Sequence, residues 1–409
     1  MILRAEHAVA ICVGLVAIAR AASADLPAEE VGQVMRLPET VGDHWVWVPD
    51  RVLNHSALFD GDTGRMLGAL DSGVQISPKA PLWSRARNEI YTVDTVYSHG
   101  HRGERKDYVV IYDSHTLDVK GDVEIPPRSM DTSNGIALVG MLDGDRFVIV
   151  LNHSPGASVT VVDLEKRRVA SEIQTQGCAG VFPAGADRFG MLCGNGTVMT
   201  VHLRGDGALD HLSHSRQFFD PVVDPVTEKG VRDGATWWFV SFEGMLHEVD
   251  FASDAPAPKP AWSLFTESER ASGSRVGGAQ HIAYHPGSKR LYSVVHEGGP
   301  GSHKDPGGEI WVYDVPAKKK RDVFDAPNLI ASFLGPQAGF EATSTTAKVL
   351  NFVLPNMGVH SIAVTRDASP LLFYRNADLG ATGVLDAQTG EHLRDITETG
   401  LSGALLVVP

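Results

Sequence analysis

The most regular feature of the chain is a short apolar and β-branched run, a turn, and a second such run that often ends in Asp. Runs of this kind bounded by turn residues are typical of β-hairpins. Seven pairs follow one another: His44–Val48 with Ala57–Asp60, Glu89–Asp94 with Tyr108–Asp113, Phe147–Leu151 with Ser158–Asp163, Arg188–Cys193 with Thr197–His202, Trp237–Phe242 with Met245–Asp250, Arg290–Val295 with Glu309–Asp314, and Leu371–Tyr374 with Thr382–Asp386. The second runs end between Asp60 and Asp386 in six steps, so their mean spacing is about 54 residues.

Repeats of this length built from strand pairs indicate four-stranded units that stack radially or linearly. We therefore predict an all-β fold, a single seven-bladed β-propeller of four-stranded antiparallel blades over residues 25–409. Because a closed ring leaves no free edge, we expect the run Trp45–Val48 to complete the last blade beside the C-terminal segment ALLVVP. The alternative is a pair of β domains, since the individual steps are uneven.

The aspartates that end the second runs are interpreted as turn residues rather than catalytic carboxylates. A carboxylate in this position can accept hydrogen bonds from backbone N–H groups of the tight turn, and Gly64 and Gly390 can take positive φ there. One short helix is predicted at Ser263–Ala271, with Thr266 and Glu269 as a capping box.

Residues 1–24 are predicted to be a cleaved signal peptide. Arg4 precedes an apolar run from Ala8 to Ala19, and Ala22-Ser23-Ala24 provides a small-residue cleavage site. The run has 12 residues, whereas a helix needs about 20 to cross the hydrocarbon core of a membrane. No later stretch is long and apolar enough to span, so we expect an exported, periplasmic protein without membrane insertion.

The overall composition indicates a globular protein that does not bind nucleic acid. Hydrophobic residues make up 43% and charged residues 21% of the 409 residues, which provides material for a core. Acidic residues outnumber basic ones by 50 to 36, and the resulting net charge of −14 repels phosphate backbones.

Cys178 and Cys193 are the two cysteines that remain after signal cleavage. An even count in an oxidising compartment predicts a disulfide between them. The alternatives are two free thiols or half of a metal site, although this spacing without a Cys-x-x-Cys motif is not typical of zinc.

The histidines and the glycine-rich segments do not form a recognisable active site. His99 and His101 could share one face of a strand, but no third ligand lies at a clear spacing; His281 and His285 would be about 13 Å apart in a strand. The segment 296–308 is glycine-rich but has no following helix to hold phosphate. We therefore expect no metal site and no catalytic residue on this chain.

Several segments resemble the heavy subunit of methylamine dehydrogenase and of its aromatic amine relative. The resemblance is carried by the order and spacing of TVYSHGHRGERKDYVVIYDSHTL (95–117), GCAGVFPAGADRFGMLCGNG (177–196), WSLFTESERASGSRVGG (262–278), AYHPGSKRLY (283–292), GSHKDPGGEIWVYD (301–314), HSIAVTRDASPLL (360–372) and LDAQTGEHLR (385–394). It covers most of residues 40–400, and the last two segments are closer to the methylamine branch.

The resemblance implies a seven-bladed propeller that pairs with a small disulfide-rich light subunit, two heavy with two light chains. The light subunit would carry tryptophan tryptophylquinone and the catalytic base, and primary amines would be deaminated to aldehyde and ammonia. Electrons would pass to a cupredoxin of the amicyanin or azurin type. The tryptophans of this chain, including Trp237 and Trp238, would then be core or interface residues.

The resemblance also points to one residue of a substrate channel. Family members place a Phe just before the second run of the first hairpin; here Pro49–Leu58 lacks an aromatic residue, and Leu53 is the nearest apolar candidate. Two other functions stay open: an exported propeller that only binds a partner, and a metal-dependent propeller lactonase or hydrolase.

Overall fold

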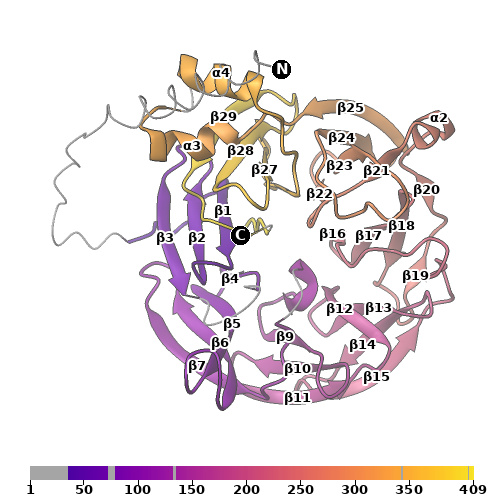
Figure 1. Ribbon diagram of the computed structural model, residues 1–409. Helices are drawn as coiled ribbons and strands as arrows, with labels where there is room; N and C mark the ends of the chain where they lie inside the picture. The colour runs from indigo at the N-terminus through magenta and orange to yellow at the C-terminus, as the bar shows by residue number, and fades with distance from the viewer. Residues whose placement is uncertain (1–35, 72–78, 132–134, 342–343, 404) are drawn as a thin grey trace.

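The structure is a computed structural model that describes residues 36–71, 79–131, 135–341, 344–403 and 405–409. Its strands form seven antiparallel sheets arranged as a ring (Figure 1), so the predicted seven-bladed β-propeller is confirmed. The predicted signal peptide lies outside the described residues.

The first four blades follow the chain in order. Blade 1 contains β1 (Trp45–Asp50), β2 (His55–Asp60) and β3 (Met66–Asp71). Blade 2 contains β4 (Leu82–Ser84), β5 (Glu89–Tyr97), β6 (Arg105–Asp113) and β7 (Val119–Ile125). Blade 3 contains β8 (Val139–Met141), β9 (Phe147–Asn152), β10 (Ser158–Asp163) and β11 (Arg168–Gln174), after the short 3₁₀ helix η1 (Ile136–Leu138). Blade 4 contains β12 (Cys178–Pro183), β13 (Arg188–Cys193), β14 (Val198–Leu203) and β15 (Leu209–His214).

The last three blades contain two interrupted strands. Blade 5 contains β16 (Val231–Asp233), β17 (Thr236–Val240), β18 (Met245–Asp250) and an outer strand in two pieces, β19 (Ala257–Pro258) and β20 (Trp262–Ser263). Blade 6 has an inner strand in two pieces, β21 (Ser274–Val276) and β22 (Ile282–His285), followed by β23 (Arg290–Glu297), β24 (Glu309–Asp314) and β25 (Lys319–Asp325). Blade 7 contains β26 (Ser361–Val364), β27 (Leu371–Arg375), β28 (Ala381–Asp386) and β29 (His392–Thr397).

The described helices lie in the connections between blades. The short helix α2 (Glu267–Ala271) has the predicted capping box of Thr266 and Glu269, although it begins later than predicted. Two helices that the sequence did not suggest, α3 (Ile330–Ala338) and α4 (Thr345–Val353), occupy the long connection before blade 7. This insertion accounts for the longest of the uneven repeat steps.

The C-terminal segment closes the ring, but not in the predicted blade. Val407 pairs with Trp47 of β1, N···O 2.8 Å and 3.0 Å, and so supplies the inner strand of blade 1. Blade 7 already has its own inner strand, β26, so the expectation that Trp45–Val48 completes the last blade is wrong. The contact between the two ends of the chain is as expected; the strand that was not recognised is β26.

A glutamine side chain fastens this closing strand. The Gln280 amide donates to the carbonyl oxygens of Leu406 (2.9 Å) and Ile362 (3.1 Å), and its oxygen accepts from the Leu406 N–H (3.1 Å). Gln280 lies between the two pieces of the inner strand of blade 6, Ile362 lies in the inner strand of blade 7, and Leu406 belongs to the closing segment. One buried side chain therefore connects three successive blades around the centre.

The apolar core is divided into seven clusters, one between each pair of neighbouring blades. The cluster between blades 3 and 4, for example, contains Ile149 and Val161 from one sheet and Phe189 and Val201 from the next. The cluster between blades 7 and 1 includes Leu406 of the closing strand. Because each sheet is covered on both faces by its neighbours, the middle strands are buried along their length rather than on alternate residues, as in β9 and β10.

The disulfide and the aspartate turns agree with the sequence predictions. Cys178 and Cys193 face each other across β12 and β13 and form a disulfide; closing a 15-residue segment contributes about 3 kcal/mol in the chain-entropy model. Asp113 and Asp163 each accept hydrogen bonds from two backbone N–H groups of the turn that follows. These carboxylates are therefore structural.

We predict that Gln280→Ala lowers the free energy of unfolding by about 2–3 kcal/mol, because it leaves buried backbone groups of the closing strand without partners. Gln388→Ala is the matched control, since the Gln388 amide makes an exposed hydrogen bond to Ala368. Equilibrium urea unfolding of the two variants measures the difference. Equal losses in both would contradict the role assigned to Gln280.

Candidate functional site: the loop face and the central cavity

The two faces of the ring differ because successive strands of a blade run in opposite directions. The connections from the second to the third strand, and those from one blade to the next, emerge on one face, which we call the loop face. It carries the long segments 97–105, 214–231, 297–309 and 325–361, including α3 and α4. The opposite face carries the short aspartate turns. Because binding residues are commonly carried on long loops, the loop face is the candidate binding surface.

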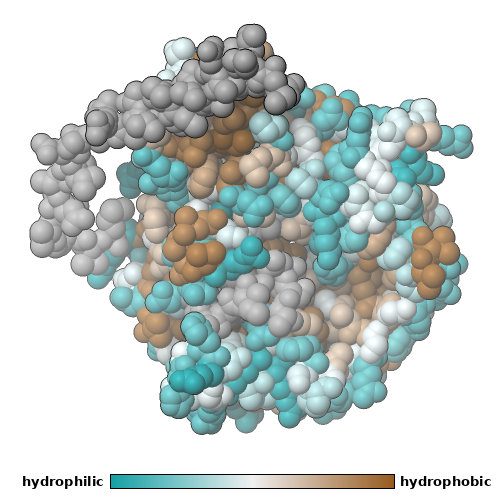
Figure 2. Space-filling view, in the orientation of Figure 1, coloured by the Kyte–Doolittle hydropathy of each residue, from teal (hydrophilic) through white to brown (hydrophobic). Residues whose placement is uncertain are grey.

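Exposed hydrophobic side chains are also concentrated on the loop face. Of the fifteen large hydrophobic residues exposed among the described residues, nine lie in its connections: Val52, Leu53, Val222, Val223, Val349, Phe352, Val353, Met357 and Leu401. Phe352 is 91% and Val222 88% exposed. On the face seen in Figure 2, hydrophobic residues form separate groups among hydrophilic loops. Exposed apolar groups of this kind are typical of a surface that contacts a partner.

The structure places Leu53, the residue predicted to line a channel, in the β1–β2 loop on this face. Its side chain is 45% exposed, and those of Val52 and Leu401 are 55% and 52% exposed. We call these three residues the Leu53 patch. Leu401 is far from Leu53 in the sequence, and only the closure of the ring brings the two loops together.

The carboxylate of Asp50 holds both loops of the Leu53 patch. Asp50 is fully buried, and one of its oxygens accepts from the N–H groups of Val52 (2.7 Å) and Leu53 (2.8 Å). The other oxygen accepts from the N–H groups of Leu401 and Ser402. A single side chain at the end of β1 therefore determines how the patch is arranged.

The ionised form of Asp50 is stabilised by these contacts. Burial by itself would raise the pKa of Asp50, but the four backbone N–H groups outweigh it and hold the pKa below its usual value. The buried guanidinium of Arg375 supplies opposite charge; it donates to the carbonyl oxygen of Gly403 at 3.0 Å and to the Thr382 hydroxyl at 3.2 Å. The two loops are therefore held by the buried carboxylate of Asp50, whose negative charge is compensated by the backbone N–H groups and by Arg375.

A second charged cluster explains part of the sequence motif at 95–117. Arg105 donates to Asp107 (2.8 Å) and to the carbonyl oxygen of Ser129 (2.7 Å), and pairs with Asp131 at 3.1 Å. Asp107 is fully buried and also accepts from the Ser129 N–H. These residues join the β5–β6 hairpin to the connection that leads into blade 3, so their role is to hold the loop face in shape.

A cavity of about 360 Å³ lies on the axis of the ring, and the inner strands of all seven blades contribute to its wall. Most of the lining is aliphatic, with Arg232 and Arg366 as the charged members. From blade 1 to blade 7, the residues that line the cavity include Leu406, Leu82, Val139, Val181, Val231, Ile282 and Ile362. The described residues that line the cavity include no Asp, Glu, Asn or His, the groups that a metal-dependent hydrolase requires at this position.

The two histidine pairs considered from the sequence contact other protein groups or are buried in the fold. His99 and His101 lie in the β5–β6 loop rather than in a strand, and His99 Nδ1 contacts the Ser98 hydroxyl. His281 is fully buried, which lowers its pKa well below the usual value. His285 contacts Ser288 and the carbonyl oxygen of Asp367. Within the described ranges, neither pair converges with a third metal-binding side chain.

The tryptophans pack in the blades. Trp45, Trp47, Trp237, Trp238 and Trp311 are buried. Trp237 contacts Phe182 with ring centroids 5.1 Å apart, and Trp238 stacks on Tyr284 at 4.5 Å. These two adjacent residues thus face opposite neighbouring blades, which agrees with the predicted core role.

In the part of the chain that the structure describes, no helix is long and apolar enough to cross a membrane.

Comparisons with known proteins find one family. Residues 49–350 match the family model described as methylamine dehydrogenase heavy chain. The chain is 25% identical to the methylamine dehydrogenase heavy chain of Methylorubrum extorquens, over 94% of this chain and 88% of that protein. It is 26% identical to the heavy chain of Paracoccus versutus, over 84% of this chain and 73% of that protein.

Among solved structures, a protein of unknown function from Desulfotomaculum acetoxidans has a similar fold. The TM-score is 0.55 at 11% identity, over 89% of this chain and 98% of that one. At this level of identity the similarity concerns the fold alone.

We predict that Asp50→Asn lowers the free energy of unfolding by about 2–3 kcal/mol at neutral pH, because an amide NH₂ would face backbone N–H donors in place of an oxygen. The wild-type advantage should be complete above the unfolded-state pKa of about 3.9 and should shrink as the pH falls through the lowered folded-state pKa. Urea unfolding from pH 7 to pH 3 measures this. A difference that stays constant down to pH 3 would contradict the assignment of an ionised Asp50.

Proposed function

Because the chain belongs to the methylamine dehydrogenase heavy chain family, we propose that it is the heavy subunit of an exported amine dehydrogenase that deaminates a primary amine. Membership of this family supports the assignment of the chain as a subunit of an oxidoreductase. The match over residues 49–350 is the observation that carries the proposal. In the proposed reaction, a primary amine and water give an aldehyde and ammonia, with release of two electrons and two protons.

The redox chemistry is assigned to the partner rather than to this chain. Tryptophan tryptophylquinone on a small disulfide-rich light subunit accepts the two electrons, and a cupredoxin of the amicyanin or azurin type receives them. The tryptophans of this chain fit that division, because they pack between blades: Trp237 contacts Phe182 and Trp238 stacks on Tyr284. The assembly is two heavy with two light chains.

The loop face is the surface on which the light subunit docks. Its exposed apolar residues supply the centre of an interface, and a stable complex needs well over about 1,000 Å² of buried surface. The Leu53 patch is the part of this surface that we assign to the substrate channel, since Leu53 is the apolar residue nearest to the position where family members have a channel-lining Phe. Asp50 then acts as a positioning residue for the channel wall.

The periplasm is the proposed compartment. The predicted signal peptide at residues 1–24 would direct export, and the disulfide between Cys178 and Cys193 fits an oxidising environment. An exported propeller that binds a partner without amine oxidation is the competing function, and it predicts a chain that is isolated without a light subunit.

We predict that Leu401→Lys weakens association with the light subunit at least about tenfold, because an ammonium group in the centre of an apolar interface must be desolvated. Val119→Lys is the matched control, since Val119 is 60% exposed on the outer strand β7, away from the loop face. Co-expression with the light chain followed by size-exclusion chromatography and titration measures this. Equal association of both variants would exclude the Leu53 patch from the interface.

We predict that Leu53→Phe in the assembled enzyme lowers kcat/KM for bulky amines relative to methylamine by about 10-fold or more, because a larger side chain narrows the channel. Leu53→Ala should change the ratio in the opposite direction. Steady-state kinetics with methylamine and a longer amine give the ratio, and the melting temperature shows that the fold is retained. An unchanged ratio in both variants would remove Leu53 from the channel.

A further inference from the structure

Two histidines face each other on the outer hairpin of blade 4. His202 near the end of β14 is the direct cross-strand partner of His211 in β15. Cross-strand partners project from the same face of a sheet, and here the two imidazole rings stack with centroids 4.1 Å apart and an angle of 8° between their planes. The Nε2 atom of each ring faces blade 5, where it contacts Asp254.

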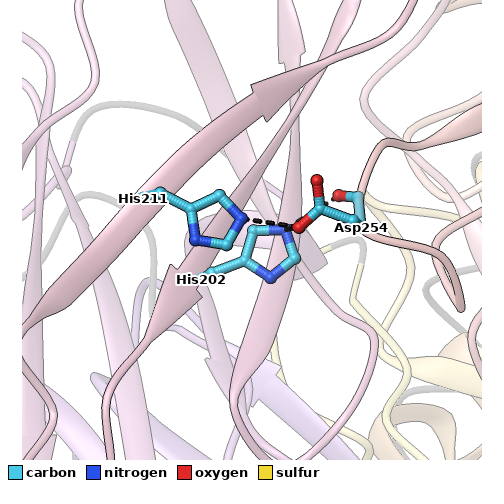
Figure 3. Close-up of side chains that lie close together, drawn as sticks. All are labelled: His202, His211 and Asp254. Carbon is cyan, nitrogen blue, oxygen red and sulfur yellow. Dashed lines mark hydrogen bonds and ion pairs between the residues drawn. The ribbon is translucent and has the colours of Figure 1, made fainter.

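A carboxylate from blade 5 completes a set of three donors. Asp254, in the turn between β18 and β19, places Oδ1 2.6 Å from His211 Nε2 and 3.9 Å from His202 Nε2 (Figure 3). His202 Nε2–H donates to the carbonyl oxygen of Asp254 at 2.9 Å, so a cation that binds Nε2 must displace this proton. Across the described ranges, these are the three His, Cys, Asp or Glu side chains whose donor atoms all lie within 4.8 Å of one another.

Neighbouring groups orient His211 and hold the turn that carries Asp254. The other ring nitrogen of His211, Nδ1, lies 2.8 Å from a carboxylate oxygen of Asp210. A carboxylate on the distal nitrogen is the usual arrangement around metal-binding histidines, because it fixes the tautomer and turns the lone pair of Nε2 toward the ion. Arg188 donates to the carbonyl oxygen of Ala252 at 3.1 Å and so holds the turn that carries Asp254.

The distances between the three ligand atoms need only a small change to match those around a bound Zn²⁺. Zn²⁺ binds imidazole nitrogen at about 2.0–2.1 Å and carboxylate oxygen at about 2.0–2.2 Å, so its ligand atoms lie roughly 3–4 Å apart. His202 Nε2 and Asp254 Oδ1 already lie 3.9 Å apart, whereas His211 Nε2 and Asp254 Oδ1 must separate from 2.6 Å. Asp254 can make this movement because its side chain is 73% exposed in a turn. The exposure also leaves room for water to complete four-coordination.

The geometry points to a binding site for a divalent transition-metal cation, Zn²⁺ by its donor set, formed by His202, His211 and Asp254. Two imidazoles and one carboxylate are donors of intermediate softness that suit Zn²⁺ better than Mg²⁺ or Ca²⁺. The cation joins the outer hairpin of blade 4 to the turn of blade 5, and so it fastens two blades at the rim. The site is independent of the proposed amine oxidation.

The test is a titration of the chelator-treated, dialysed full chain with Zn²⁺ by calorimetry, together with Co²⁺ as a spectroscopic probe. We expect one equivalent of Zn²⁺ to bind and to raise the melting temperature, because the folded ring alone brings Asp254 to the histidines. His211→Ala and Asp254→Asn should each weaken binding at least about tenfold. Both side chains are exposed enough for the fold to tolerate their replacement.

His214→Ala is the control, because His214 lies on the same strand but on the opposite face of the sheet. It should bind Zn²⁺ as the wild type does, with the same visible absorption of bound Co²⁺. The inference is overturned if the wild type shows no saturable site, or if His211→Ala and Asp254→Asn bind as tightly as His214→Ala; the three groups would then form hydrogen bonds only.

Discussion

The burial of every blade between two neighbours is the constraint on which this structure depends. Each of the seven apolar clusters is shared by two sheets, and none belongs to one blade alone. An open ring would divide one of these clusters and expose one half of it at each end, so closure is part of the core rather than an addition to it. The pairing of Val407 with Trp47 and the three hydrogen bonds of the Gln280 amide provide that closure.

A ring closed in this way leaves its connections available for function. The aspartate turns of one face are short, and their carboxylates accept hydrogen bonds from backbone N–H groups of the same turn. The loop face instead has long segments and most of the exposed large hydrophobic residues. Asp50 links the closed ring to the loop face, since it ends strand β1 and its carboxylate also arranges the loops of Leu53 and Leu401. In the proposed function, this chain contributes a shaped apolar surface and a channel wall, and its partner contributes the reactive group.

The sequence predicted the features that depend on local pattern. The hairpin Ser158–Asp163 with Phe147–Leu151, the aspartate turns and the capping box at Thr266 follow from neighbouring residues, and they were found as expected. The inner strands were harder to predict, because β4, β8 and β26 are only three or four residues long and have no hairpin signal of their own. That is why the closing strand was assigned to blade 7 instead of blade 1.

Features that join distant parts of the chain could not be predicted. The register of one hairpin would have placed His202 opposite His211, but nothing in the sequence connects them to Asp254 in the next blade. Leu53 was identified by family resemblance, whereas Leu401 is joined to it through the Asp50 carboxylate only after the ring closes.

Purification from the native source without denaturant, followed by a visible spectrum and electrophoresis under denaturing conditions, tests the central claim most directly. The account predicts a quinone absorption band and a second, small, cysteine-rich polypeptide that co-purifies with this chain. A colourless preparation that contains this chain alone would contradict the account.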